Sequence, residues 1–156
     1  MSSGSGLALV LSAALFVSGC GGGGDGEQAA ETVQGEATQV AGGEKAGRGA
    51  LEVELNEWDV IPAKDATQPG KVTFQARNTG SVPHALEVIL TDVKAGAFPV
   101  KGGVAEVKGK KLADVGDIAG GASKQLSVIL ERGHYALICN LPGHYEAGMH
   151  SDFQVE

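Results

Sequence analysis

The residues best suited to chemistry lie near the C-terminus, where a cysteine, a histidine and a methionine are evenly spaced. Four residues separate Cys139 from His144, and four more separate His144 from Met149. A second imidazole, His84, follows a proline further upstream. One thiolate, two imidazoles and a weak axial thioether form the ligand set of a blue-copper electron-transfer centre. This pattern therefore predicts a mononuclear copper site.

Each of these residues also has an ordinary structural interpretation. A cysteine at the end of an apolar strand is usually a core residue. The combination favours a metal site, because the chain has only two cysteines and two methionines, one of which is Met1. His134 and His150 are the other candidate imidazoles. We expect His134 on the surface at the far end of the Cys139 strand, and His150 exposed on the other sheet face.

The ligands need a rigid scaffold, and residues 50–156 show the short alternating patterns typical of β-strands. No amphipathic helix pattern separates them, and residues 92–119 are expected to be irregular, with a short helix or an extra strand near 104–107. Seven to eight strands predict an all-β, Greek-key sandwich or barrel. The clearest strands are expected over 51–55, 72–77, 84–90, 124–130, 134–139 and 151–155. In this arrangement Cys139 ends one strand and Met149 starts the next, with His144 on the loop between them.

The first 49 residues differ from the rest of the chain. Leu7–Val17 is an apolar run of eleven residues. This run is shorter than the roughly 20 residues that span a bilayer and is typical of a secretory signal. The small residues before Cys20 resemble a bacterial lipobox, although residues 2–6 lack the usual lysine or arginine. We therefore interpret residues 1–19 as a lipoprotein signal peptide and Cys20 as the lipid anchor.

Residues 20–49 are predicted to form a disordered tether, because they are rich in glycine and poor in large apolar side chains. The folded domain is then residues 50–156. If Cys20 carries the lipid, Cys139 is a lone thiol in a compartment where thiols tend to oxidise, and a metal-binding role would explain its presence. The expected location is extracytoplasmic, on a bacterial membrane.

Composition excludes several classes of protein. The chain has 12 basic and 19 acidic residues, a net charge of −7, and its few basic residues are too dispersed for a nucleic-acid interface. Two cysteines allow at most one disulfide. Multicopper oxidases and nitrite reductases need further copper ligands or domains that this chain lacks, so we do not expect an enzyme. A monomer is expected.

The predicted domain resembles a known protein family. Residues 50–156 are similar to the cupredoxins, in particular the bacterial plastocyanin- and azurin-like copper proteins. The similarity is carried by RNTGSVPH at residues 77–84 and by YALICNLPGHYEAGM at residues 135–149. The Cys–His spacing is that of azurin and the His–Met spacing that of plastocyanin, a combination that resembles rusticyanin and sulfocyanin.

The resemblance implies a protein that carries single electrons on one type 1 copper, held by His84, Cys139, His144 and Met149. It also implies that His144 is partly exposed and serves as the electron port, within an apolar patch for which the plausible members are Leu141, Pro142 and Ala147. Where the family often has asparagine after the first histidine ligand, this chain has Ala85.

Asn78 or Asn140 is therefore expected to supply the hydrogen bonds that orient the ligands. The redox partners are expected to be proteins, and neither donor nor acceptor can be named. A copper chaperone or store that delivers the metal to an extracytoplasmic enzyme is the alternative, because the ligand set alone does not exclude it.

Overall fold

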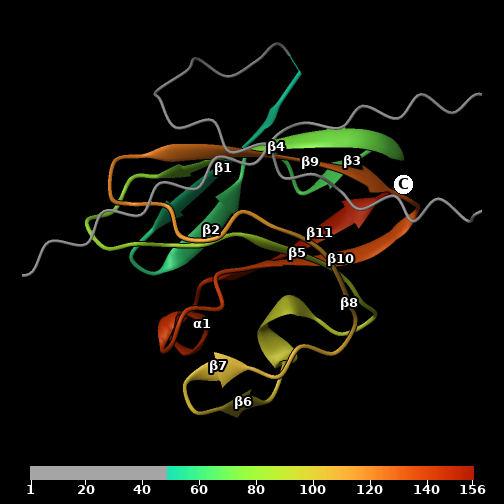
Figure 1. Cartoon of the computed structure of the whole chain (residues 1–156). Helices are drawn as coiled ribbons and strands as arrows, with labels where there is room; N and C mark the ends of the chain where they lie inside the picture. The colour runs from blue at the N-terminus through green and yellow to red at the C-terminus, as the bar shows by residue number, and fades with distance from the viewer. Residues whose placement is uncertain (1–48) are drawn as a thin grey trace, which may run out of the picture. The chain divides into compact units, whose positions relative to one another are not determined.

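The structure is a computed structural model and describes residues 49–156. The predicted signal peptide, Cys20 and nearly all of the predicted tether lie outside the described residues. No helix in the described part of the chain is long and apolar enough to cross a membrane. The elements, labelled in Figure 1, are β1 (Leu51–Asn56), β2 (Asp59–Pro62), β3 (Ala66–Thr67), β4 (Gly70–Asn78), β5 (Glu87–Leu90), η1 (Ala95–Ala97), β6 (Val100–Lys101), β7 (Val104–Ala105), β8 (Lys110–Asp114), β9 (Ser123–Leu130), β10 (Gly133–Ile138), α1 (His144–Ala147) and β11 (His150–Val155).

The strands form two main sheets, which confirms the all-β prediction. One has the order β2-β1-β4-β9 and the other the order β3-β11-β10-β5-β8. The β1–β4 and β11–β3 pairs are parallel, and the other pairs within these sheets are antiparallel. The two sheets hold nine strands rather than seven or eight. The difference arises because β2 and β3 are short and β8 lies in the segment expected to be irregular.

Strand β10 is the centre of the second sheet and is buried on both faces. Side chains alternate between the two faces of a strand. Tyr135, Leu137 and Cys139 face the main core, whereas Ala136 and Ile138 join a second apolar cluster. The continuous apolar run of this strand is the pattern of a strand covered on both sides.

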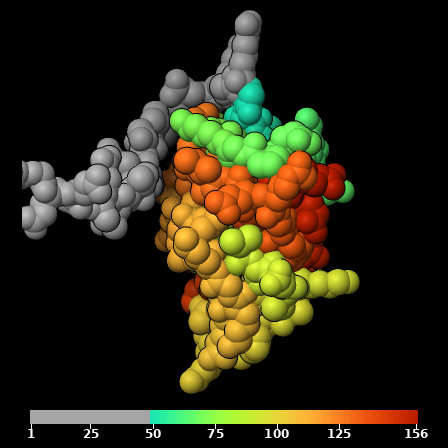
Figure 2. All heavy atoms as spheres, turned by 90° about the vertical axis from the view of Figure 1, so that its right-hand side faces the viewer, coloured from blue at the N-terminus to red at the C-terminus, as the bar shows by residue number. Residues whose placement is uncertain are grey.

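The second cluster is covered by a segment that was expected to be irregular, with a short helix or an extra strand near 104–107; the extra strand is present as β7. Ala95 and Phe98 from the η1 region and Ala105 from β7 pack in this cluster with Tyr145 of α1. Figure 1 shows the β6–β7 hairpin next to α1, and in Figure 2 the yellow and amber atoms of this region fill the lower part of the visible face. Residues 92–109 thus add a small layer outside the sheet that carries Cys139.

Candidate metal centre

Three potential ligands meet at one end of the second sheet. The donor atoms of His84, Cys139 and His144 all lie within 4.8 Å of one another. The two histidine Nδ1 atoms are 3.2 Å apart, and the Cys139 Sγ is 3.5 Å from the His144 Nδ1. His84 and Cys139 are fully buried, and His144 is half-buried. The structure therefore brings together three of the four predicted ligands.

The two spacings measured from the His144 Nδ1 fit a shared metal ion. In zinc sites, imidazole nitrogens lie about 2.0–2.1 Å and thiolate sulfurs about 2.3 Å from the ion. At such bond lengths two ligands of one ion cannot be more than about 4.4 Å apart. The observed 3.2 Å and 3.5 Å lie within this limit. Two imidazoles and one thiol with this convergence could supply the nitrogen and sulfur ligands of a blue-copper site.

Met149, the fourth predicted ligand, is fully buried in the same core as Cys139. Its backbone closes the loop between the ligands. The Cys139 N–H donates to the Met149 carbonyl at 3.0 Å, and the Met149 N–H donates to the His144 carbonyl at 3.2 Å. These two bonds tie the backbones of Cys139, His144 and Met149 to one another.

The segment between Cys139 and Met149, expected to be a loop, contains a short helical turn, α1. His144 is its first residue. Gly143 and Gly148 flank the turn with φ of 83° and 125°, values that favour glycine. A Cβ at Gly148 would also approach the Trp58 carbonyl to 3.0 Å. The two glycines allow the chain to reverse twice within a few residues.

His84 lies before a strand rather than at its start. It forms a single bridge with Ile118, in which each backbone N–H donates to the other's carbonyl. The fully buried Asn78 holds this region together. Its Oδ1 accepts the Gly80 N–H, and its Nδ2 donates to the carbonyls of Val82 and Ile118 at 2.7 and 2.8 Å. Asn78 therefore fixes the loop that carries His84.

Asn140, the other predicted orienting residue, ties the ligand loop to the β6–β7 hairpin. Its Oδ1 accepts the Ala105 N–H at 2.7 Å, and its Nδ2 donates to the Ala105 carbonyl at 3.3 Å. A backbone bond from Gly143 to Gly103 at 2.7 Å joins the same two segments. Asn140 thus braces the loop against a neighbouring layer.

The predicted patch residues lie on the same loop as His144. Pro142 and Ala147 are exposed, and Leu141 is half-buried.

Sequence reasoning missed Trp58, in the turn between β1 and β2. Trp58 is 43% exposed, and its indole meets the rings of His144 and His84 nearly at right angles, with ring centroids 5.2 and 6.4 Å away. Its being the chain's single tryptophan is the only sequence signal that could have drawn attention to it.

Sequence reasoning also missed Glu57, which lies beside Trp58. The Glu57 carboxylate accepts the N–H groups of Ser81 and Val82 at 2.6 and 2.9 Å. It also lies 3.6 Å from the His84 Nε2. The hydrogen bonds from Val82 and Ser81 lower the pKa of Glu57 below its ordinary value, so the carboxylate stays ionised near neutral pH.

Burial favours the uncharged forms of two predicted ligands. It raises the pKa of the Cys139 thiol, although the N–H groups of Leu141 and Ala85 act in the opposite direction. It also lowers the pKa of His84, with a further contribution from nearby His144. The Ala85 N–H lies 3.2 Å from the sulfur. A metal cation reverses this balance at a thiol, because coordination requires the thiolate.

The other two candidate histidines, His134 and His150, lie outside the cluster of His84, Cys139 and His144. His134 is at the far end of β10, as predicted, but it is half-buried and hydrogen-bonded. One ring nitrogen is 2.8 Å from the Thr91 carbonyl and the other is 2.8 Å from the Asp152 carboxylate. His150 lies half-buried against the ring of Tyr145, with centroids 5.2 Å apart. The expectation that both histidines are simple surface residues was therefore only partly correct.

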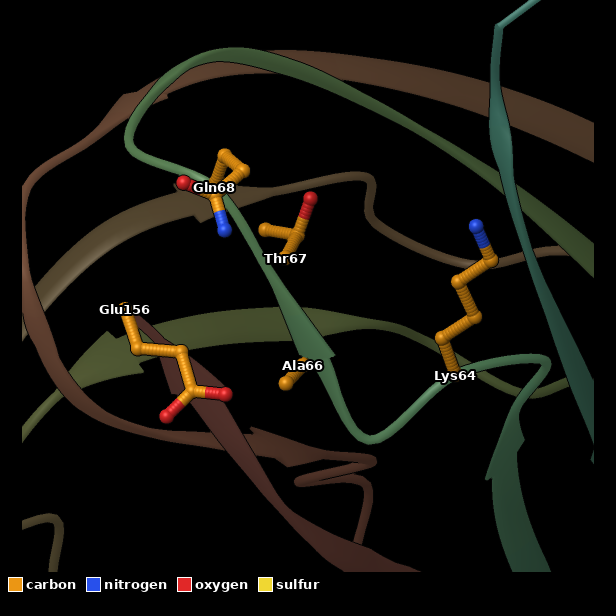
Figure 3. Close-up of a pocket in the computed structure, with 5 residues that line it drawn as sticks. All are labelled: Lys64, Ala66, Thr67, Gln68 and Glu156. Carbon is orange, nitrogen blue, oxygen red and sulfur yellow. The ribbon is translucent and has the colours of Figure 1, made fainter.

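A separate hollow of about 290 Å³ lies near β3 and contains none of the predicted site residues. Figure 3 shows the short strand with Ala66 and Thr67 between Lys64 and Glu156. The hollow is lined by Lys64, Ala66, Thr67, Gln68 and Glu156. These side chains do not form a set of metal ligands.

A β-sandwich with two histidines, one cysteine and one methionine at one end defines the cupredoxins, the class of blue copper proteins. The model of the sulfocyanin (SoxE) domain matches residues 61–156, and the chain belongs to this family. No curated protein sequence matches the chain.

Solved structures show the same fold. Auracyanin from Roseiflexus castenholzii aligns with a TM-score of 0.52 at 16% identity, over 69% of this chain and 97% of its own. Auracyanin A, a blue copper protein from Chloroflexus aurantiacus, aligns with a TM-score of 0.50 at 20% identity, over 69% and 98%. Auracyanin B aligns with a TM-score of 0.51 at 20% identity, over 77% of this chain and 96% of its own. At these identities the likeness concerns the fold alone.

Proposed function

We propose that this chain is a single-electron carrier whose one type 1 copper is held by His84, Cys139, His144 and Met149. The observation that carries the proposal is the convergence of the two Nδ1 atoms and the sulfur, at 3.2 and 3.5 Å. Bound copper would supply a one-electron couple between Cu(II) and Cu(I). Membership in the sulfocyanin family supports the same function.

The protein's own contribution is a site that is rigid and mostly dry. His84, Cys139 and Met149 are fully buried, and backbone bonds fix the loop between the last two. A stiff scaffold limits the change of geometry on electron transfer. The half-buried His144 lies among exposed loop residues, so the proposed route for electrons runs through its ring edge to a protein partner.

Copper delivery is the alternative use of the same ligands. The complete burial of three of the four candidates supports the carrier, because release of the metal would require the loop to open. The two functions differ in measurable rates. A carrier combines fast electron self-exchange with slow copper loss, whereas a delivery protein passes copper rapidly to an acceptor.

The decisive experiment is to load the folded protein with Cu(II) and record its visible spectrum. We expect an intense charge-transfer band from the thiolate to copper. The band should be lost in Cys139→Ala and kept in the control His150→Gln, which changes a histidine outside the cluster. A wild-type protein that binds Cu(II) without this band would rule out a blue-copper site, as would a band that survives in Cys139→Ala.

We further propose that Cys20 is lipidated and that residues 21–49 tether the domain to the outer side of a bacterial membrane. The support is the apolar run followed by small residues and cysteine. Membrane fractionation of cells expressing the full sequence, with mass spectrometry of the N-terminal peptide, tests this proposal. Cys20→Ser should move the protein to the soluble fraction, and wild-type protein found there without a lipid would contradict it.

A further inference from the structure

The ring of His84 has a nitrogen on its far side that lacks a hydrogen-bond partner. His84 is fully buried, its Nδ1 faces His144, and its Nε2 lies on the opposite side of the ring. No hydrogen bond reaches this Nε2 within the described residues. A buried N–H without a partner costs free energy, so the group that lies next to it is of interest.

The neighbouring group is the Glu57 carboxylate. Its Oε1 lies 3.6 Å from the His84 Nε2, slightly beyond ordinary hydrogen-bond distance. The carboxylate itself is held in place by the N–H groups of Ser81 and Val82. Gly80 leaves the space that it occupies, because a Cβ there would collide with the carboxylate. The loop before His84 is therefore built around this negative charge.

Resting on the function proposed above, we propose that Glu57 is a positioning residue for His84 that also lowers the reduction potential of the site. Histidines that bind metals usually donate their second N–H to a carboxylate, a carbonyl or a water. An Nε2–H directed at Glu57 leaves the lone pair on Nδ1, which faces Cys139 and His144. This is the tautomer that metal binding at Nδ1 requires.

The effect on the potential follows from charge. With one thiolate ligand and neutral histidines, the oxidised site carries one more positive charge than the reduced site. A carboxylate near the His84 ring stabilises the more positive state. The side chain of Glu57 is 28% exposed, so water screens the interaction only in part. Removing the charge should therefore raise the reduction potential.

The test compares Glu57→Gln with Glu54→Gln in the copper-loaded protein. Both changes remove one carboxylate, but Glu54 is exposed on β1 and its carboxylate bonds to the Thr79 hydroxyl instead. We expect the potential to shift upward in Glu57→Gln and to stay near the wild-type value in Glu54→Gln. An equal potential in the two variants would overturn the assignment of the charge effect.

A second measurement follows the proton itself. In the diamagnetic Cu(I) form, the His84 Nε2–H signal and its exchange with water can be recorded by NMR. We expect faster exchange in Glu57→Ala than in wild type. Unchanged exchange would overturn the positioning role. If Glu57→Ala does not fold, Glu57→Asp keeps the charge but shortens the side chain, and the same acceleration is expected.

The two proposals fail in different ways. If wild-type protein shows no charge-transfer band, the blue-copper function is wrong, whatever Glu57 does. If the band is present but Glu57→Gln leaves the potential unchanged and Glu57→Ala leaves the N–H exchange unchanged, only the role of Glu57 is wrong.

Discussion

The Nδ1 atoms of His84 and His144 lie 3.2 Å apart, although sixty positions separate the two residues in the chain. The pairing of β5 with β10 brings them together, because Glu87 is paired with Ile138. His84 precedes β5, and the loop with His144 follows β10. The candidate site is therefore assembled by strand pairing and by the loops at one end of the sheet.

Replacing Asn78 should destabilise the domain and disturb the His84 loop. Asn78→Ala removes the acceptor of the half-buried Gly80 N–H and one donor to each of the carbonyls of Val82 and Ile118, although the Ile118 carbonyl keeps the His84 N–H. A hydrogen bond contributes about 0.5–1.5 kcal/mol net, so the loss of these bonds should lower the unfolding free energy by about 2 kcal/mol. Urea denaturation measures it. The control Thr73→Ala removes an exposed side-chain bond and should cost no more than about 0.5 kcal/mol; similar losses in both would contradict the prediction.

Trp58 should report copper binding through its fluorescence. It is the chain's only tryptophan, and its ring centroid is 5.2 Å from that of His144. A visible-absorbing Cu(II) centre this close should quench its emission, and removal of the metal with a chelator should restore it. Fluorescence titration with Cu(II) measures the effect. Cys139→Ala should show much weaker quenching at the same copper concentration. Full emission from a copper-loaded wild-type protein would show that Trp58 does not adjoin the metal.

Tyr145 should anchor the outer layer to the ligand loop. Its buried hydroxyl donates to the Ala95 carbonyl at 2.7 Å and accepts the Phe98 N–H at 2.9 Å. Tyr145→Phe should cost about 1–3 kcal/mol and speed hydrogen exchange at the Phe98 amide. Tyr135→Phe is the matched control, because the Tyr135 hydroxyl bonds, among residues 49–156, only to the Glu131 backbone. Equal exchange at Phe98 in both variants would be inconsistent with the anchor.

Asp152 should make a stability contribution that disappears in acid. Partial burial acts to raise the pKa of Asp152, but hydrogen bonds from the Ala95 N–H and from His134 outweigh it and lower the pKa below 3.8. A lowered pKa means that the stabilisation is present above the ordinary value near 3.8 and is lost as pH falls through the folded-state value.

Unfolding experiments on wild type and Asp152→Asn across pH test this prediction. The variant should be less stable at neutral pH, and the two proteins should converge below about pH 4. The difference should be small, at most about 1 kcal/mol, because the Asp152 side chain is 50% exposed. If the difference in unfolding free energy between the two proteins grew as the pH fell, the prediction would be contradicted.

Much of the fold could be predicted from local pattern. The alternation in β1, β4 and β9 indicated strands because one face of each is apolar. The extra strand expected near 104–107 is present as β7, but its place in a layer over β10 was missed, although the unbroken apolar run of β10 already required cover on both faces. Two-residue strands such as β6 and β7 have no periodicity of their own, and their pairing with each other defines them.

The residues of the candidate site also fall into those that could be predicted from the sequence and those that could not. Cys139, His144 and Met149 could be predicted because they share one short loop, and spacing along the chain limits their separation in space. Glu57 and Trp58 could not, since they lie in a turn of the other sheet. Their relation to His84 depends on how the two sheets pack and on the loop held by Asn78.

The sequence by itself determined the kind of chemistry, because the types of donor atom are fixed by residue identity. It also determined the all-β class, since alternation reflects which side chains must avoid water. Only the tertiary structure decided which nitrogen of each histidine faces the cluster, which residues surround it, and that Glu57 lies behind His84. The physical reason is that these relations are distances between segments far apart in the chain, and packing of the sheets sets them.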